Sequence, residues 1–381
     1  MINRRRITDT VLELLRLDSH SKEEKPVADY LVAKLQAIGC EVRMDDAGRL
    51  VQANAGNVIA RLVSPAGAGA PILLSAHMDV VPPARGVTPV EEPDRVRSDG
   101  TTVLGGDDKT GLAIILEVLR CLKDDARPHP TVEVAFTICE EIGLLGAKHL
   151  DFAQFQAREA IVLDSAHATE LVTCAPSADR YTFTVHGLEA HAGVCPENGI
   201  SAVRVAAEAI AAMPLGRIDA RTTANVVIAG GPTATNVIPN LCVVRGEARS
   251  LDEARLNEVM GSIRAAFMAA AQRATVERDG ETHRAWIEET CAREYSGFRI
   301  DDDTPIVQLV RRAAQASGTS VRTVTIGGGS DANVFNRHGI TSVNLGTGMR
   351  DIHTVKEWID LTDFCRSAEI VLACVKERAA A

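Results

Sequence analysis

The stretch Ile72-Leu-Leu-Ser-Ala-His-Met-Asp79 places a histidine and an aspartate directly after a short apolar run. An apolar run of this length is typical of a buried strand. In open α/β sheets the functional side chains lie where the strands end. The stretch therefore predicts a strand within residues 71–81 that delivers His77 and Asp79 to a site.

Two further apolar runs end in carboxylates in the same way. Residues 132–138 form a predicted strand that ends at Glu140 and Glu141, and residues 160–163 form another that ends at Asp164. Strands that all end in polar residues are expected to deliver them to one edge of a sheet.

A helix is predicted directly after Asp107 and Asp108. Over residues 110–122, one side of the helix would carry Leu112, Ile115, Leu116 and Leu119. This spacing is that of an amphipathic helix. We therefore expect four polar segments at the exits of strands in an open α/β sheet.

The pattern changes in the middle of the chain. A β-α-β-β-α succession is predicted over residues 180–185, 201–213, 224–229, 241–248 and 256–271. This block contains none of the polar segments and has about 120 residues, which is the size of a domain. The α/β alternation resumes with a helix over residues 305–316. We expect one domain in two parts, residues 1–175 and 297–381, interrupted by an inserted domain, residues 176–296.

The composition is that of a globular protein. With 381 residues the chain exceeds the size at which a single hydrophobic core stops growing. Its 46% apolar and 24% charged residues are ordinary for folded proteins. A net charge of −10 and an aromatic content of 3% argue against a nucleic-acid partner, which needs positive charge and rings for stacking.

The cellular location is expected to be cytoplasmic. Arg4, Arg5 and Arg6 are followed by a helical pattern that contains Asp9 and Glu13, so no apolar core of a signal peptide follows them. No stretch approaches the roughly 18 apolar residues of a membrane span. Nine cysteines without a Cys-x-x-Cys pair indicate reduced thiols. We expect no membrane partner.

Five segments carry residues with the chemistry of metal ligands: His77-Met-Asp79, Asp107-Asp108, Glu140-Glu141, Asp164 and His353. A set of two histidines and three acidic residues drawn from these segments fits two Zn²⁺ ions that share a bridging carboxylate. Two ions about 3.5–4 Å apart polarise a carbonyl and activate a water together, so the pattern predicts a hydrolase.

Each segment alone also has an ordinary structural interpretation. His77 and Asp79 fit a hydrogen-bonded pair at a strand end, Glu140-Glu141 a solvated helix start, and Asp107-Asp108 a helix N-cap. The surface interpretation does not fit Glu140-Glu141, because they directly follow the apolar stretch 134–139. Burying carboxylates there without cations would cost several kcal/mol each.

Longer motifs around these residues resemble one known family. The motifs are Gly105-Gly-Asp-Asp-Lys-Thr-Gly111, Glu140-Glu-Ile-Gly-Leu-Leu-Gly-Ala147, His191-Ala-Gly193, Ala234-Thr-Asn-Val-Ile-Pro239, Gly246-Glu-Ala-Arg-Ser250 and Gly328-Gly-Ser-Asp-Ala-Asn333. As an ordered set over residues 10–375 they resemble the peptidase T / glutamate carboxypeptidase-type family of co-catalytic zinc peptidases, and within it the peptidase T-like branch. The resemblance implies an α/β fold, with a mixed-sheet catalytic domain and an inserted α+β lid and dimerisation domain. It also implies a homodimer.

The resemblance implies a ligand set for two Zn²⁺ ions in each subunit. Asp107 would bridge the ions, His77 and Asp164 would complete one site, and Glu141 and His353 would complete the other. Co²⁺ or Mn²⁺ would also suit these oxygen and nitrogen ligands. Three ligand carboxylates and one bridging hydroxide would offset the four positive charges.

Two carboxylates near the ligands have other implied roles. Glu140 would stay off the metals as the general base, taking a proton from the bridging water and passing it to the leaving amine. Asp79 would accept the ring N–H of His77 and raise the basicity of that imidazole.

Six further residues match positions that contact substrate in the family: His191, Asn236, Arg249, Gly328, Gly329 and Ser330. His191 would reach the active site of the partner subunit and stabilise the oxyanion, while Arg249 and the glycine loop would grip a terminal carboxylate. The residues alone also fit plainer roles, namely a surface-loop histidine, an exposed charge on a strand, and a tight turn with Ser330 as N-cap.

The predicted function is that of a dizinc aminopeptidase that removes the N-terminal residue from a di- or tripeptide. One alternative is an amidohydrolase or carboxypeptidase for N-acyl amino acids or glutamyl conjugates, because the metal machinery would be the same. Others are a non-catalytic peptide-binding homologue and a purely structural dimer module. Side-chain specificity is not encoded in any of these motifs.

Overall fold

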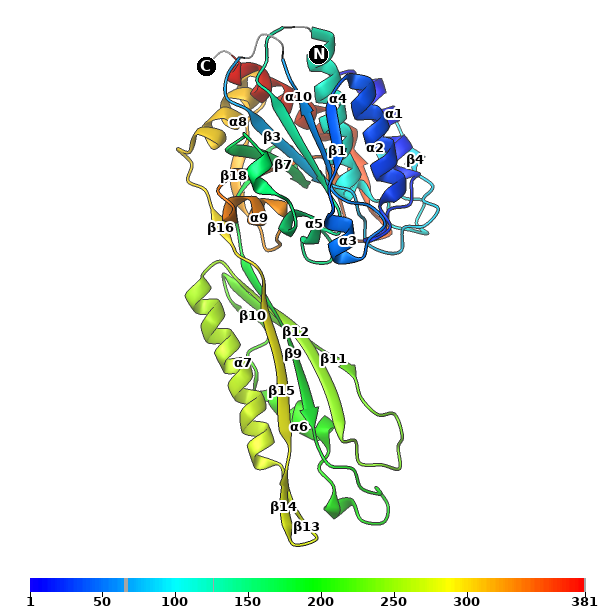
Figure 1. The fold of residues 1–381 in the computed structure, drawn as a ribbon, viewed down its shortest axis with the longest axis vertical. Helices are drawn as coiled ribbons and strands as arrows, with labels where there is room; N and C mark the ends of the chain where they lie inside the picture. The colour runs from blue at the N-terminus through cyan, green and yellow to red at the C-terminus, as the bar shows by residue number, and fades with distance from the viewer. Residues whose placement is uncertain (65–67, 126, 380–381) are drawn as a thin grey trace. The chain divides into compact units, whose positions relative to one another are not determined.

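The computed structural model describes residues 1–64, 68–125 and 127–379, which form two compact units (Figure 1). Unit 1 consists of Met1–Ala175 and Phe298–Ala381, and unit 2 of Pro176–Gly297. The chain leaves unit 1 once and returns to it, so unit 1 is discontinuous in sequence.

Unit 1 is built on a mixed sheet of nine strands. In sheet order, with β17 last because it pairs only with β8, they are β1 (Glu41–Met44), β2 (Val58–Leu62), β6 (Val132–Thr137), β3 (Ile72–His77), β7 (Glu159–Ser165), β18 (Thr341–Gly346), β8 (Glu170–Ala175), β16 (Phe298–Arg299) and β17 (Arg322–Thr325). The strand predicted within 71–81 is β3, and it pairs in parallel with both β6 and β7. The carboxyl ends of these three strands therefore meet at one edge of the sheet.

Both faces of the central strands are covered. Every residue of β3 and β6 is buried, as expected of parallel strands with a layer on each side. The helices of unit 1 are α1 (Arg4–Leu15), α2 (Lys25–Ile38), α3 (Ala47–Val51), α4 (Gly106–Asp125), α5 (Leu145–Lys148), the 3₁₀ turn η1 (Phe152–Gln154), α8 (Pro305–Ala316), α9 (Asp331–Arg337) and α10 (Leu361–Arg378). A small second sheet has the order β19 (Met349–Arg350), β20 (Trp358–Asp360), β5 (Arg95–Arg97) and β4 (Val90–Glu91).

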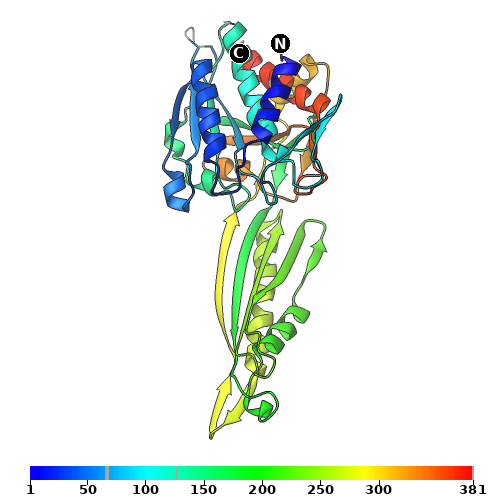
Figure 2. The same ribbon diagram turned by 90° about the vertical axis from the view of Figure 1, so that its right-hand side faces the viewer.

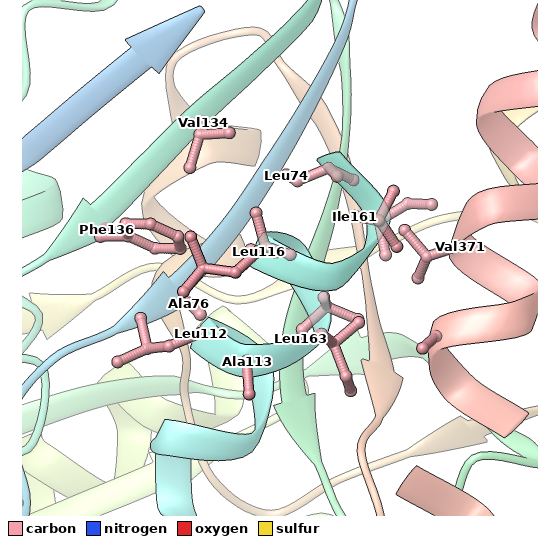
Figure 3. Close-up of a cluster of buried hydrophobic side chains, with 14 of the residues drawn as sticks. Leu74, Ala76, Leu112, Ala113, Leu116, Val134, Phe136, Ile161, Leu163 and Val371 are labelled. Atoms are coloured by element: carbon pink, nitrogen blue, oxygen red, sulfur yellow. The ribbon is translucent and has the colours of Figure 1, made fainter. Parts of the chain in front are cut away.

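Helix α4 lies in the middle of the core of unit 1. It packs against β3 and β7 and is flanked by α1 and α10. Figure 3 shows Leu112 and Leu116 of α4 among side chains of β3, β6 and β7, with Val371 of α10 nearby. The predicted helix had one apolar stripe, whereas Ile114 and Val118 on the other side are also fully buried. A helix surrounded on all sides needs apolar residues all round.

Unit 2 is a five-stranded antiparallel sheet with its own helices and core (Figure 2). In sheet order the strands are β10 (Gly216–Asp219), β11 (Thr222–Gly230), β12 (Leu241–Ser250), β9 (Ser177–His186) and β15 (Trp286–Tyr295). The remaining elements are the 3₁₀ turn η2 (Pro196–Asn198), α6 (Ala202–Ala212), α7 (Glu253–Arg273) and the hairpin of β13 (Thr275–Arg278) and β14 (Glu281–Arg284). Phe183 of β9 stacks on Phe267 of α7 with ring centroids 4.2 Å apart, which joins the sheet to the helix.

The expected β-α-β-β-α order of unit 2 is incomplete, because β10, β13, β14 and β15 were not predicted. The most important omission is β15, which pairs with β9 along its length. Its helix-facing side carries Glu289, which pairs with Arg264 of α7, and Arg293, which pairs with Asp179. Ion pairs there take the place of an apolar run, so the strand has no hydrophobic pattern to detect.

Over residues 1–64, 68–125 and 127–379, no helix combines the length and the apolar character needed to cross a bilayer.

The position of α4 predicts a large effect of truncating its side chains. Leu116 is fully buried, whereas Leu50 of α3 is 64% exposed. We expect Leu116→Ala to lower the free energy of unfolding of unit 1 by about 2–5 kcal/mol, and Leu50→Ala to change it by no more than about 0.5 kcal/mol. Urea unfolding followed by the fluorescence of Trp358, in a Trp286→Phe background, measures both values in unit 1. Equal effects of the two substitutions would contradict the central position of α4.

Candidate metal centre

His77 is the last residue of β3 and is almost completely buried. Its Nδ1 lies 2.9 Å from the backbone carbonyl oxygen of Asp79. Because a carbonyl oxygen only accepts, Nδ1 carries the ring proton and Nε2 is the atom available to a cation. Nε2 faces Oδ1 of Asp107 at 3.1 Å and Oδ1 of Asp164, near the end of β7, at 3.9 Å.

Asp107 lies between two histidines. One carboxylate oxygen, Oδ1, is 3.1 Å from Nε2 of His77, and the other, Oδ2, is 3.2 Å from Nε2 of His353. A carboxylate that offers one oxygen to each of two imidazoles has the geometry of a bridge between two cations.

Among the residues that the structure describes, the side chains that could hold an ion form three groups whose ligand atoms lie within 4.8 Å of one another. The groups are His77 with Asp107 and Asp164, Asp107 with Glu141 and His353, and His77 with Glu140 and Glu141. The first two groups share Asp107, and they have the same members as the two ligand sets that the resemblance implies. The third group places Glu140 close enough to serve as a ligand or as a base beside the ions.

The two ends of the centre differ in exposure. His353 follows β19 with a left-handed backbone angle φ of +61°, and its Nε2 lies 3.0 Å from Oε1 of Glu141. The side chain of His353 is 47% exposed, whereas that of His77 is 2% exposed. The His77 end is therefore closed by the sheet, and the His353 end faces solvent.

Asp107 does not lie at a strand exit, which corrects one expectation from the sequence. It stands in the first turn of α4, where Asp107 and Asp108 have non-helical backbone angles. Gly105 before them has a φ of +78°, a conformation that favours glycine. The irregular turn, and not the end of a strand, presents Asp107 to the histidines, while β3, β7 and the segments after β6 and β19 present the other residues.

Asp79 has contacts beyond the one expected with the ring of His77. Its backbone carbonyl oxygen lies 2.9 Å from Nδ1 of His77, and its carboxylate Oδ1 lies 3.5 Å from the same atom. The carboxylate also accepts the backbone N–H groups of Glu140 at 2.8 Å and Glu141 at 3.2 Å, and the hydroxyl of Ser21 at 2.6 Å. Asp79 therefore fixes the turn that carries both glutamates, because that turn has left the hydrogen-bonded sheet.

Burial raises the pKa of Glu140 and Asp164, whereas the pKa of Asp107 lies below its usual value, because hydrogen bonds with His353 and His77 outweigh the effect of burial. The pKa values of Glu140 and Asp164 lie well above their ordinary range, first because both groups are removed from water and also because other carboxylates are close. Neighbouring Asp107 is one such charge for Asp164, and Asp331 is one for Glu140.

The pKa values of the two imidazoles are also raised, but the cause is their hydrogen bonds and not burial. Burial lowers the pKa of His77, but its hydrogen bonds to carboxylates outweigh this effect and raise the pKa well above its usual value. Hydrogen bonds with Asp107 and Glu141 raise the pKa of His353 to about 10. Positive charge at the centre would therefore stabilise its buried carboxylates, and its imidazole and carboxylate donors suit Zn²⁺.

Asp331 and Glu24 are buried acidic residues near the centre that had no role in the sequence interpretation. Asp331, at the start of α9, accepts a hydrogen bond from the hydroxyl of Thr137 at the end of β6, and burial raises its pKa to about 6. Glu24 accepts the N–H of Cys139, directly before Glu140, at 3.0 Å. Asp331 belongs to a quoted motif and could have been suspected, whereas no spacing connects Glu24 with residue 139.

The glycine loop lies in unit 1 between β17 and α9. Ser330 is the N-cap of α9, and the side chain of Asn333 accepts the backbone N–H of Ser330 at 3.0 Å. The loop of Gly328 and Gly329 therefore has the plainer role considered for it, a turn into a capped helix. A loop with this role can also contact a substrate.

His191 and Asn236 lie side by side in unit 2. His191 forms a bridge with Val237, and the N–H of Ala192 donates to the carbonyl of Asn236 at 2.9 Å. The N–H of Gly193 donates to Nδ1 of His191 at 3.2 Å. In the neutral ring the proton is then on Nε2, which can donate to a substrate.

Arg249 lies on β12 between β11 and β9. Its guanidinium makes two hydrogen bonds to the carboxylate of Glu247, at 2.9 and 3.2 Å. The structure therefore shows Arg249 with a carboxylate already bound in the bidentate manner expected for a substrate.

Comparison with known proteins agrees with this geometry. The family model for peptidase family M20/M25/M40 matches residues 73–377. The aminopeptidase PepT of Bacillus cereus ATCC 10987 is 38% identical over all of both chains, with a TM-score of 0.87, and a tripeptidase of Staphylococcus aureus subsp. aureus Mu50 is 35% identical over all of both chains, with a TM-score of 0.91. Peptidase T of Vibrio cholerae serotype O1 is 25% identical over 94% of this chain and 92% of its own. The chain therefore belongs to peptidase family M20/M25/M40, as a peptidase T-like metallopeptidase.

Proposed function

We propose that this protein is an aminopeptidase that removes the N-terminal residue from di- and tripeptides with two bound Zn²⁺ ions. The observation that carries the proposal is the position of Asp107 between His77 and His353. A short peptide as substrate is supported by the similarity to an aminopeptidase and a tripeptidase over the whole chain.

The proposed ligands follow the two groups that share Asp107. His77 and Asp164 would hold one ion, Glu141 and His353 would hold the other, and Asp107 would be shared by both. Bound there, the ions would polarise the scissile carbonyl and lower the pKa of the attacking water. Co²⁺ or Mn²⁺ are alternatives, because the donors are oxygen and nitrogen.

Glu140 is the proposed general base. It follows β6 and is largely buried, and its backbone is held by the carboxylate of Asp79. Its carboxylate takes a proton from the attacking water and delivers it to the amine that leaves. Asp79 contributes by keeping Glu140 and Glu141 in one fixed turn, so that the positions of the base and the ligand relative to each other do not change.

We assign catalysis to the discontinuous domain and a lid and dimer contact to the inserted one, residues 176–296. β11 supports the dimer contact. Its outer edge pairs with β10 only as far as Ala224, and past that point no strand in the described part of the chain covers it. Val227 and Ile228 there are 54% and 61% exposed. An unpaired edge with apolar side chains suits pairing with a second copy of the chain.

The substrate contacts are proposed from the same resemblance. His191 of the partner subunit would donate its Nε2 proton to the oxyanion, with Asn236 beside it. Arg249 and the loop of Gly328, Gly329 and Ser330 would hold the terminal carboxylate of the peptide. That carboxylate would compete with Glu247 for the guanidinium of Arg249. We also propose a cytoplasmic location, because all nine cysteines are free thiols.

We expect the purified protein with Zn²⁺ to release alanine from Ala-Ala-Ala and to leave N-acetylalanine intact, measured by chromatography of the products. A chelator should abolish the activity and Zn²⁺ should restore it. Cleavage of N-acetylalanine alone would favour the amidohydrolase, and no cleavage of any peptide at saturating Zn²⁺ would favour a peptide-binding protein.

Glu140 and Glu141 are adjacent but have different proposed roles, so they provide a matched pair of variants. Glu140→Ala should lower kcat by about 10²–10⁴-fold, since it removes a proton acceptor, while two Zn²⁺ ions per chain remain. Glu141→Ala should lose one tightly held ion. Metal analysis after gel filtration, together with kcat, separates the two roles. If Glu140→Ala also lost an ion, Glu140 would be a ligand, as the third group of side chains permits.

His191 gives a test of the dimer. His191→Ala should lower kcat by roughly 10²–10³-fold without changing the metal content. If His191 acts across subunits, mixing His191→Ala with Glu140→Ala chains should restore about a quarter of the wild-type activity, because half of randomly formed dimers are mixed and each has one complete site. Lack of any recovery in verified mixed dimers would mean that His191 acts in the active site of its own subunit or has no role in catalysis.

A further inference from the structure

We propose that Glu357 is a positioning residue that fixes the loop carrying Asp107 and thereby sets the affinity of the centre for its cations. The inference rests on the proposed role of Asp107 as the bridging ligand. Glu357 lies between the two small strands β19 and β20, and no motif in the sequence pointed to it. Its side chain is 1% exposed.

The carboxylate of Glu357 accepts three backbone N–H groups from one loop. Oε2 accepts those of Leu104 and Gly105, each at 2.8 Å, and Oε1 accepts that of Asp107 at 3.0 Å. Burial raises the pKa of Glu357 to about 7, while the three N–H groups favour its ionised form, to which hydrogen bonds are about twice as strong as to a neutral acceptor. Successive N–H groups that converge on one anion form a concave backbone site, here filled by a side chain of the same chain.

The loop depends on these bonds because it lacks regular structure. Asp107 and Asp108 have non-helical angles, and the N–H groups of the first residues of a helix have no partner within the helix. Gly106 permits the close approach of Glu357, since a Cβ built there would lie 3.0 Å from Oε1. Both the backbone conformation and the missing side chain of the loop are thus fitted to the carboxylate.

Glu357 also connects two ligands of one ion group. It stands four residues after His353, and its own backbone is fixed by bonds to Thr354 at 3.1 Å and Ser98 at 3.0 Å. The segment that carries His353 therefore holds the loop that carries Asp107. The separation of these two ligands, 3.2 Å between Nε2 and Oδ2, is set through this connection.

Charge alone offers a competing explanation. Glu357 lies within electrostatic range of the buried Lys109, and removing any negative charge near cations would weaken their binding. Glu357→Asp separates the two explanations, because it keeps the charge but is one methylene too short to reach all three N–H groups. Glu357→Gln removes the charge and turns an NH₂ group toward at least one N–H donor.

Glu133 provides a matched control for burial. It is also 1% exposed, accepts the N–H groups of Gln156 and Ala157 at 3.2 and 2.9 Å, and pairs with Arg61. It lies on β6 four residues before Thr137, at the end of the strand away from the metal centre. Glu133→Gln should lower stability to a similar extent without reaching the ligands.

The test measures Zn²⁺ affinity and stoichiometry by competition with a chromophoric chelator, together with thermal unfolding of the metal-free proteins. We expect Glu357→Gln and Glu357→Asp to bind Zn²⁺ about 10- to 100-fold more weakly than wild type, and Glu133→Gln to bind it with wild-type affinity. Wild-type affinity in Glu357→Asp would overturn the positioning role in favour of charge. An equal loss in Glu133→Gln would overturn it in favour of general destabilisation. Failure of the wild-type protein to bind two ions would instead refute the proposed function.

Discussion

Carboxylates that converge in a buried place need positive charge beside them, and unit 1 is arranged around this requirement. The parallel strands β3, β6 and β7 end at one edge of the sheet and carry His77, the Glu140–Glu141 turn and Asp164 there. Mutual repulsion and loss of water make this collection of acids unfavourable on its own. The two histidines and the proposed cations are the groups that make the arrangement tolerable.

The scaffold holds these residues in two different ways. Strand ends are rigid because the sheet is buried on both faces, so His77 needs only one backbone contact to orient its ring. The irregular segments have no such support, and buried carboxylates replace it: Asp79 binds the N–H groups of the Glu140 turn, and Glu357 binds those of the Asp107 loop. The acidic residues near the centre thus divide into those that face the ions and those that hold the backbone.

Prediction from the sequence succeeded where one physical signal dominated. The helix predicted over 305–316 is α8, because its apolar period is clear and Pro305 stands at its first turn. The strand β3 followed from an apolar run that only a buried strand would carry. By contrast, β15 could not be found, because ion pairs with Asp179 and α7 replace apolar contacts on its covered side. Asp107 was expected at the exit of a strand, but it stands in the irregular first turn of α4.

The sequence by itself determined the fold class and the kinds of side chain at the centre, because apolar periodicity and residue chemistry are local properties of the chain, and its ordered motifs indicated the family by resemblance. Only the tertiary structure decided how those side chains are held. The place of Asp107 between two histidines, the backbone contacts of Asp79, and the hydrogen bonds of Glu24 and Glu357 all join residues that are distant in sequence. Such contacts form through packing of the whole unit, so no pattern of spacing along the chain records them.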